Sequence, residues 1–217
     1  MPFDLSTSTN FTTSSQPLNE HIYIKKFVDY VRETTVNITE EMMFDWLKIK
    51  QRWPWNATSN ILLGEDFRES VCVLTNVGMK TNSFYSTHNN IGLYLDFDKW
   101  FWFHERGFLT TISDVLDLNQ DLRDIEEKGR EILGFSVFAN FYFARKSNVD
   151  QTTPSFAPHK HFYPVVIKQI YGESLWLVNS DKFTLKPQET LYIPRDTEHA
   201  VLENSTDKLS LTLNLNH

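Results

Sequence analysis

The sequence lacks several features that mark common protein classes. It contains a single cysteine, Cys72, so it forms neither an internal disulfide nor a cysteine-based zinc site. One thiol fits a reducing compartment, and a metal ion would have to be held by His, Asp or Glu. No run of Lys or Arg exceeds two residues and the net charge is −7, which argues against a nucleic-acid backbone as a partner.

Long apolar runs and recognisable signals are also missing. No apolar stretch reaches the length of about 18 residues that a membrane helix needs. The first residues have no basic region followed by an apolar one, so we expect a soluble, cytoplasmic protein without a membrane partner. The motifs of serine hydrolases, P-loop proteins, dinucleotide-binding folds and zincins are absent as well.

The first half of the chain mixes helical and strand-like patterns. The start of HIYIKKFVDYV (21–31) alternates as a strand does. Thr39 is a candidate N-cap for a following helix, which Pro54 would end. Three segments rich in aromatic and β-branched residues predict strands: 70–77, 91–103 and 109–112. Residues 116–133 predict the main helix, and Gly134 ends it.

The second half predicts the fold class. Residues 135–217 divide into short apolar runs bounded by turn residues, as in an antiparallel barrel or jelly roll. We therefore predict a mainly β fold with flanking helices, built on a double-stranded β-helix. The Ser/Thr-rich residues 1–19 predict a flexible tail. No shift in composition divides 20–217, so we expect one domain, with 20–134 covering the barrel core formed by 135–217.

Three histidines are the candidate chemistry of this barrel. His159 and His161 are two residues apart on a predicted strand, so both side chains lie on one face. His199 begins a later strand, and an antiparallel barrel can bring it beside the other two. Three imidazoles predict a site for one divalent transition metal with positions open for water, O2 or substrate. The remaining histidines stand in no such pattern: His21, His88, His104 and His217.

The same region resembles a known family. NFYF, FAPHKHFYPVVIKQIYGESLWLV and LKPQETLYIPRDTEHAVLENSTDKLSLTLNL resemble the JmjC and cupin-like oxygenases, especially their ribosomal-oxygenase branch, over residues 138–215. The resemblance implies a double-stranded β-helix, a mononuclear non-haem Fe(II) centre and 2-oxoglutarate-dependent hydroxylation. It makes His159 and His199 the first and last metal ligands.

The resemblance also suggests residues around a cosubstrate. Asn140 and Tyr142 match positions that line the 2-oxoglutarate pocket, and the Tyr142 hydroxyl is a candidate catalytic hydrogen-bond donor. Asn214 matches a polar position near the metal. Arg145 is a nearby cation in the loop before the histidines. Ser174 stands where the family has a lysine that pairs with the distal carboxylate of 2-oxoglutarate.

Two departures from the family leave the function open. His161 replaces the carboxylate ligand, so the centre gains about one unit of positive charge. Ser174 cannot neutralise a carboxylate. Our main prediction is an Fe(II)-dependent dioxygenase, 2-oxoglutarate-dependent, that oxidises a small molecule or a peptide side chain. The alternatives are a cosubstrate-independent three-His enzyme (dioxygenase, isomerase or lyase) and a non-catalytic binding barrel. By analogy, residues 80–105 are expected to face the substrate.

Overall fold

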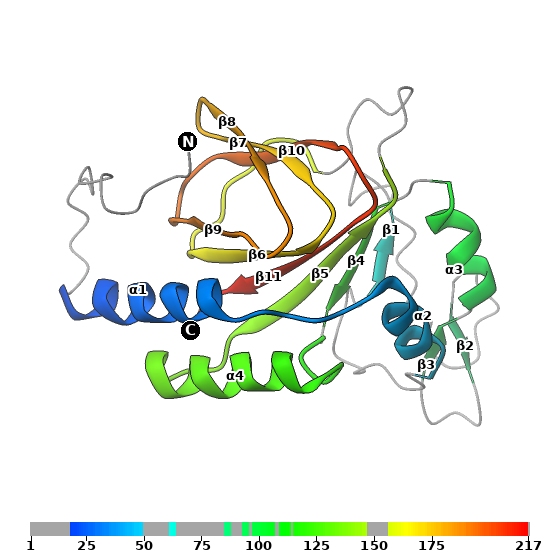
Figure 1. Ribbon diagram of the computed structural model, residues 1–217, viewed down its shortest axis with the longest axis horizontal. Helices are drawn as coiled ribbons and strands as arrows, with labels where there is room; N and C mark the ends of the chain where they lie inside the picture. Colours follow the sequence, from blue (N-terminus) through cyan, green and yellow to red (C-terminus); the bar gives the residue numbers. More distant parts are fainter. Residues whose placement is uncertain are drawn as a thin grey trace.

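The computed structural model describes residues 18–49, 61–63, 85–87, 93–95, 97–106, 109–113, 115–146 and 156–216. Its helices in this part of the chain are α1 (Leu18–Glu33), α2 (Glu40–Ile49), α3 (Phe97–His104) and α4 (Gln120–Leu133) (Figure 1). None of the described helices is long and apolar enough to cross a membrane.

A large antiparallel sheet forms the centre of the molecule. Its strands lie in the order β1-β4-β5-β11-β6-β9. Their bounds are β1 (Ile61–Leu63), β4 (Thr110–Ser113), β5 (Phe138–Ala144), β11 (Lys208–Asn214), β6 (Val165–Tyr171) and β9 (Thr190–Ile193). The N-terminal part, which we expected to cover the barrel, therefore also contributes β1 and β4 to its sheet.

A smaller sheet faces the large one. It has the order β10-β7-β8, with β7 (Ser174–Val178), β8 (Asp181–Leu185) and β10 (His199–Asn204); β2 (Tyr85–Thr87) and β3 (Leu93–Leu95) pair separately. One cluster of buried side chains joins the two facing sheets: Val165, Ile167, Trp176, Val178, Leu185, Leu191, Ile193 and Val201. Two antiparallel sheets closed around a shared interior confirm the predicted double-stranded β-helix.

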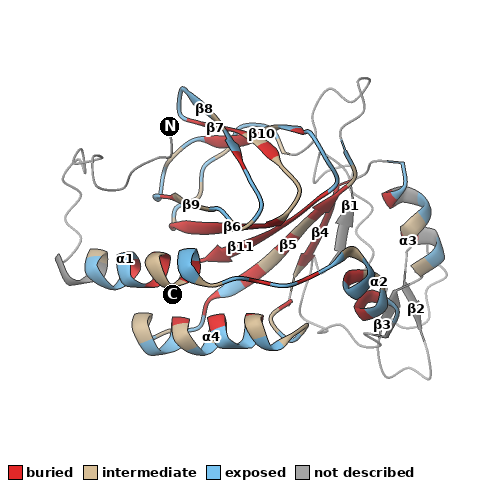
Figure 2. Cartoon of the chain, in the orientation of Figure 1, coloured by how far each residue is buried: buried red, intermediate tan, exposed pale blue. Residues whose placement is uncertain are grey.

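The other face of the large sheet is covered by α1 and α4 (Figures 1 and 2). Its outward side chains join the helices in the main core: Phe141, Phe143, Leu209, Leu211 and Leu213 from the sheet, with Phe27, Val28, Val31, Leu122 and Ile125 from the helices. Because strand side chains alternate, the polar residues of β11 face the barrel instead. They are Lys208, Ser210, Thr212 and Asn214.

The strand predicted at the start of residues 21–31 is wrong, because these residues lie in α1. The apolar side chains that are buried here are spaced by three and four residues: Ile24, Phe27, Val28 and Val31. Ile22 and Tyr23, which produced the apparent alternation, are exposed. The helical period therefore decides the conformation over the longer window.

Other predictions around the helices have mixed outcomes. Among the described residues of the predicted strand 91–103, only β3 is extended and the rest lie in α3, so this prediction is wrong for most of them. The predicted strand 109–112 is confirmed by β4. Thr39 caps α2 as predicted, because its Oγ1 accepts a hydrogen bond from the Met42 amide at 3.2 Å. Gly134 ends α4 in the left-handed conformation, with a φ of 80°.

Some predictions fall outside the described residues. They are the segment 70–77, the helix end at Pro54 and the tail 1–19, apart from the two residues that begin α1.

Candidate metal site

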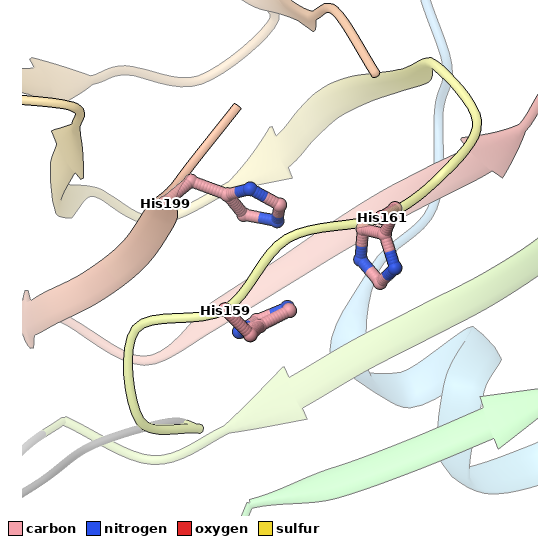
Figure 3. A group of neighbouring side chains, drawn as sticks. All are labelled: His159, His161 and His199. Carbon is pink, nitrogen blue, oxygen red and sulfur yellow. The ribbon is translucent and has the colours of Figure 1, made fainter. Parts of the chain in front are cut away.

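The three predicted metal ligands converge on one point (Figure 3). One ring nitrogen of each of His159, His161 and His199 lies within 4.8 Å of the others. The ring centroids are 4.5 Å apart for His159 and His199, 5.0 Å for His159 and His161, and 5.2 Å for His161 and His199. Such a spacing lets one ion of about 2 Å bond length reach all three nitrogens after small side-chain rotations.

The strand predicted for His159 and His161 is not formed. Both lie in the segment 156–164 before β6, where His159 makes a single isolated bridge with His199 at the start of β10. His161 reaches the same point from an irregular segment, and its carbonyl accepts a hydrogen bond from the Asp196 amide at 2.7 Å. The prediction of convergence is thus confirmed, although its structural reason was different.

Backbone carbonyls orient two of the rings. Nδ1 of His159 lies 2.9 Å from the Ala157 carbonyl oxygen, and Nδ1 of His199 lies 2.9 Å from that of Thr197. A carbonyl only accepts, so each Nδ1 carries the hydrogen and each Nε2 keeps its lone pair free. A hydrogen bond from the ring nitrogen that does not bind the metal is the usual way in which proteins fix the orientation of a metal-binding histidine.

Aromatic neighbours restrict the rings further. Tyr163 stacks on His161, with ring centroids 5.1 Å apart and ring planes at 16°. The ring centroids of Trp176 and His199 are 6.4 Å apart. Burial lowers the pKa of His161 to about 4, helped by His159 and His199. Burial also lowers the pKa of His199, against the raising effect of its hydrogen bond to Thr197. Both imidazoles are neutral at neutral pH, which is the form that binds metal.

The donor set fits a transition metal. In the described part of the chain, the group of converging ligands holds three imidazoles and no carboxylate. Nitrogen donors suit Fe, Zn, Cu, Ni and Co, whereas Mg²⁺ and Ca²⁺ require oxygen. Three protein ligands leave coordination positions for other groups.

The histidines border a pocket inside the barrel. Its apolar lining is Phe156, Val165, Ile167, Trp176, Ala200 and Val201, and its polar lining besides the histidines is Tyr142, Lys208, Ser210 and Thr212. The three histidines are therefore a candidate metal site at the border of a mostly apolar cavity.

Comparisons with known proteins add little to this geometry. No family model and no curated protein matches the sequence. A cupin superfamily protein from Desulfitobacterium hafniense is similar in structure at 17% identity, over 37% of this chain and 68% of that one, with a TM-score of 0.33. KdgF from a Halomonas species is similar at 17% identity, over 37% of this chain and 70% of that one, with a TM-score of 0.31.

A third similar structure is that of the DMSP lyases RdDddP and RnDddQII, at 14% identity over 49% of this chain and 46% of that one, with a TM-score of 0.34. All three TM-scores lie below 0.5, and the two facing sheets by themselves define the fold. The resemblance to JmjC and ribosomal oxygenases stays a prediction.

The structure brings only one of the predicted cosubstrate residues into the pocket. Tyr142 lines it, and burial together with Tyr163 raises the pKa of Tyr142 to about 12, so its hydroxyl keeps its proton. Asn140 and Asn214 lie on β5 and β11 but are not among the lining residues. Ser174 is fully buried outside the lining, and its Oγ has no partner among the described residues.

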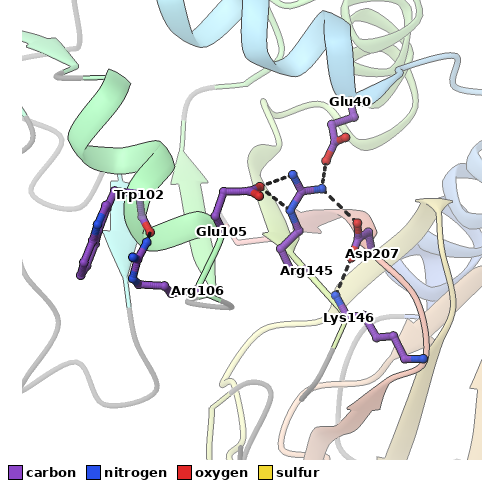
Figure 4. Close-up of polar contacts among 7 residues, drawn as sticks. All are labelled: Glu40, Trp102, Glu105, Arg106, Arg145, Lys146 and Asp207. Atoms are coloured by element: carbon purple, nitrogen blue, oxygen red, sulfur yellow. Dashed lines mark hydrogen bonds and ion pairs between the residues drawn. The ribbon is translucent and has the colours of Figure 1, made fainter.

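Arg145 is engaged elsewhere (Figure 4). Its guanidinium donates to Glu40 and Glu105, and to Asp207 at 3.0 Å. These bonds tie the end of β5 to α2, to the end of α3 and to the turn before β11. Arg145 is thus a structural cation outside the pocket and does not contact a ligand there. Among the described residues of 80–105, none lines the pocket either.

Sequence reasoning missed Lys208. It lies at the start of β11, is 1% exposed and lines the pocket with the histidines. The signal was present in KLSLTLN, where leucines alternate with Lys208, Ser210, Thr212 and Asn214. When the leucine face packs on helices, the polar face must point into the barrel. Burial lowers the pKa of Lys208 to about 7.

Proposed function

We propose that this protein is a mononuclear metal-dependent enzyme that acts on a small molecule in the barrel pocket, with His159, His161 and His199 as the metal ligands and no need for 2-oxoglutarate. The observation that carries the proposal is the convergence of three imidazoles, two of them oriented by backbone carbonyls, on one point at the edge of a pocket. A purely structural metal site would instead be closed by a fourth protein ligand.

The donor set favours a cosubstrate-independent enzyme. Three neutral ligands leave the full charge of a divalent ion uncompensated, which suits direct binding of an anionic substrate group. When bound, the metal would supply Lewis-acid polarisation or a site for O2. The reaction class is therefore that of a three-His dioxygenase, isomerase or lyase.

The residues of this chain have separate tasks in such a site. The histidines hold and orient the metal. The apolar wall that includes Val165, Ile167 and Trp176 keeps bulk water from the reacting molecule. The Tyr142 hydroxyl, which stays protonated, donates a hydrogen bond to a substrate oxygen.

A second candidate is an Fe(II)- and 2-oxoglutarate-dependent oxygenase. Its support is that a tyrosine and a lysine, Tyr142 and Lys208, line the same pocket as the histidines, although Ser174 and Arg145 do not. In this case Lys208 would take the place of the missing family lysine. The two candidates share the metal ligands and differ in the cosubstrate.

Anaerobic titration tests the proposal. Metal-free protein is titrated with Fe(II), Co(II) and Zn(II), and binding is followed by calorimetry and by the visible spectrum of Co(II). We expect one ion per chain with tight binding in the wild type and strong loss in His199→Ala. O2 consumption and succinate release are then measured with Fe(II) and 2-oxoglutarate. Succinate release would favour the second candidate, and absence of metal binding would contradict both.

A further inference from the structure

We propose that Lys208 is an anion-binding residue and that the pocket takes a small carboxylic acid, whose carboxylate pairs with the Lys208 ammonium while another part of the molecule reaches the three histidines. The contact with a metal at the histidines rests on the proposed function. The contact with Lys208 does not.

The position of Lys208 supports this assignment. It is the first residue of β11, and its side chain lies on the same face as Ser210 and Thr212, which also line the pocket. Tyr142 is paired with Ser210 in the register of β5 and β11. The lysine, the serine and the tyrosine therefore form a polar strip that crosses the pocket wall.

The ammonium of Lys208 has no protein partner among the described residues. No hydrogen bond or ion pair joins it to them, although its side chain is buried. A buried charge without a partner is costly, so such a group is expected to meet a counter-ion in its working state.

Lys168 provides the contrast within the same sheet. It is also 1% exposed, but it lies on the opposite face of β6, toward α1. Its ammonium donates to the carbonyl oxygens of Arg32 at 3.2 Å and Gln188 at 2.8 Å, so it caps the end of α1 and needs no ligand. The two buried lysines thus differ, because Lys168 has backbone partners outside the pocket whereas Lys208 lines the pocket.

The acid nearest in sequence is kept away from Lys208. Asp207 accepts hydrogen bonds from Arg145 at 3.0 Å and from the Lys146 amide at 2.6 Å. Its carboxylate is therefore satisfied outside the barrel. This arrangement leaves the positive charge of Lys208 for a ligand.

The charge of the complete site points in the same direction. The converging ligands include no carboxylate, so a bound divalent ion keeps its charge. Together with Lys208 this makes a cationic pocket with apolar walls, whose complement is a short acid with one or two negative charges. The acid is either the substrate itself or a 2-oxoacid cosubstrate.

Equilibrium binding to the full chain tests the proposal. Succinate, 2-oxoglutarate and the uncharged dimethyl succinate are titrated into metal-free and Zn(II)-loaded protein. We expect both acids to bind and the diester to bind at least about tenfold more weakly. In Lys208→Met the affinity for succinate falls by about tenfold or more, Lys208→Arg keeps most of it, and the matched control Lys168→Met leaves it unchanged.

The arms of the experiment separate the possible sources of the carboxylate. A strong preference for 2-oxoglutarate that appears only with Zn(II) indicates a chelating cosubstrate. Similar affinity for both acids indicates an acid substrate. Succinate affinity that does not change in Lys208→Met overturns the proposal. Failure of Zn(II) to bind, with succinate still bound through Lys208, overturns only the proposed function.

A measurement on the wild type avoids dependence on the variant's folding. Lysine acetylation is followed by mass spectrometry with and without succinate. We expect succinate to slow the modification of Lys208 and to leave that of Lys168 unchanged. Equal rates with and without succinate would contradict the anion site.

Discussion

His159 and His199 exchange two backbone hydrogen bonds, with N···O distances of 3.1 and 3.0 Å. His199 begins β10 in the small sheet, while His159 lies in the segment that leads into β6 of the large sheet. The bridge therefore joins the two sheets at the point where the candidate ligands meet.

A metal bound at this junction should stabilise the fold. With free Zn(II) at 100 times its dissociation constant, the free energy of unfolding should rise by about 3 kcal/mol, because the ion binds only the folded state. Urea unfolding with and without Zn(II) measures this. His159→Ala and His199→Ala should abolish most of the increase. His21→Ala, on α1, serves as the control and should keep it; an equal increase in all variants would exclude the three-His site.

The turn before Lys208 depends on Gly172. Its φ is +73°, and a Cβ there would lie 2.1 Å from the Asp207 carbonyl oxygen. Gly172→Ala should therefore cost about 3 kcal/mol or more and weaken succinate binding, because Lys208 must move. Gly134 has a φ of +80° but no atom within 4 Å of its Cβ position.

Gly134→Ala is the matched control and should lower the free energy of unfolding by only about 1 kcal/mol. Its alanine is strained by the positive φ, but its Cβ contacts no other atom. Urea denaturation measures both variants. Equal costs would mean that the contact between Gly172 and Asp207 does not constrain the turn.

Arg145 should matter for stability and not for metal binding. Its side chain is 20% exposed and joins three carboxylates that are each 37% to 47% exposed. Arg145→Leu leaves these carboxylates without their cation, and we expect a loss of about 2 kcal/mol after allowance for solvent screening.

The control for Arg145 is Arg130→Leu, which removes an exposed pair with Glu126 on α4 and should cost less than about 0.5 kcal/mol. Zn(II) affinity is measured in both variants. A large fall in Zn(II) affinity in Arg145→Leu alone would mean that Arg145 does contribute to the metal site, near which the sequence analysis had placed it.

The barrel and the convergence of its three histidines were predictable because their signals are local and redundant. Short runs between turns predict an antiparallel barrel, and three histidines at the start of two such runs are seldom accidental. The convergence of His159 and His161 survives the absence of the predicted strand, because the bridge to His199 and the hydrogen bond to Asp196 fix the segment instead.

The sequence-based predictions that were wrong or incomplete depend on packing between distant segments. Whether Arg145 faces a pocket depends on Glu40, Glu105 and Asp207, which come from three distant segments. Lys208 was overlooked because the face of β11 that meets the helices is known only when α1 and α4 are placed. Residues 21–31 show the same limit, since a short alternation is outweighed by a helical period that packs on the sheet.

The protein should lose stability in acid because His104 is buried in its neutral form. This residue of α3 is fully buried between Trp100 and Phe143, with ring centroids 5.0 and 4.2 Å away, and neither ring nitrogen has a partner among the described residues. Burial, and secondly Arg145, lower its pKa to about 3. In the unfolded chain His104 becomes protonated below about pH 6.5, whereas in the folded chain it stays neutral down to about pH 3. The free energy of unfolding therefore falls as the pH drops from 6.5 toward 3, by up to about 1.4 kcal/mol per pH unit.

His104→Phe should remove this contribution, because the ring that replaces it fits the same aromatic surroundings and does not titrate. We expect the variant to lose less stability than the wild type between pH 7.5 and about pH 5, as measured by urea unfolding at several pH values. His21→Gln, on α1, is the control and should keep the wild-type dependence. The same loss of stability in His104→Phe and in the wild type would mean that other groups cause the acid sensitivity.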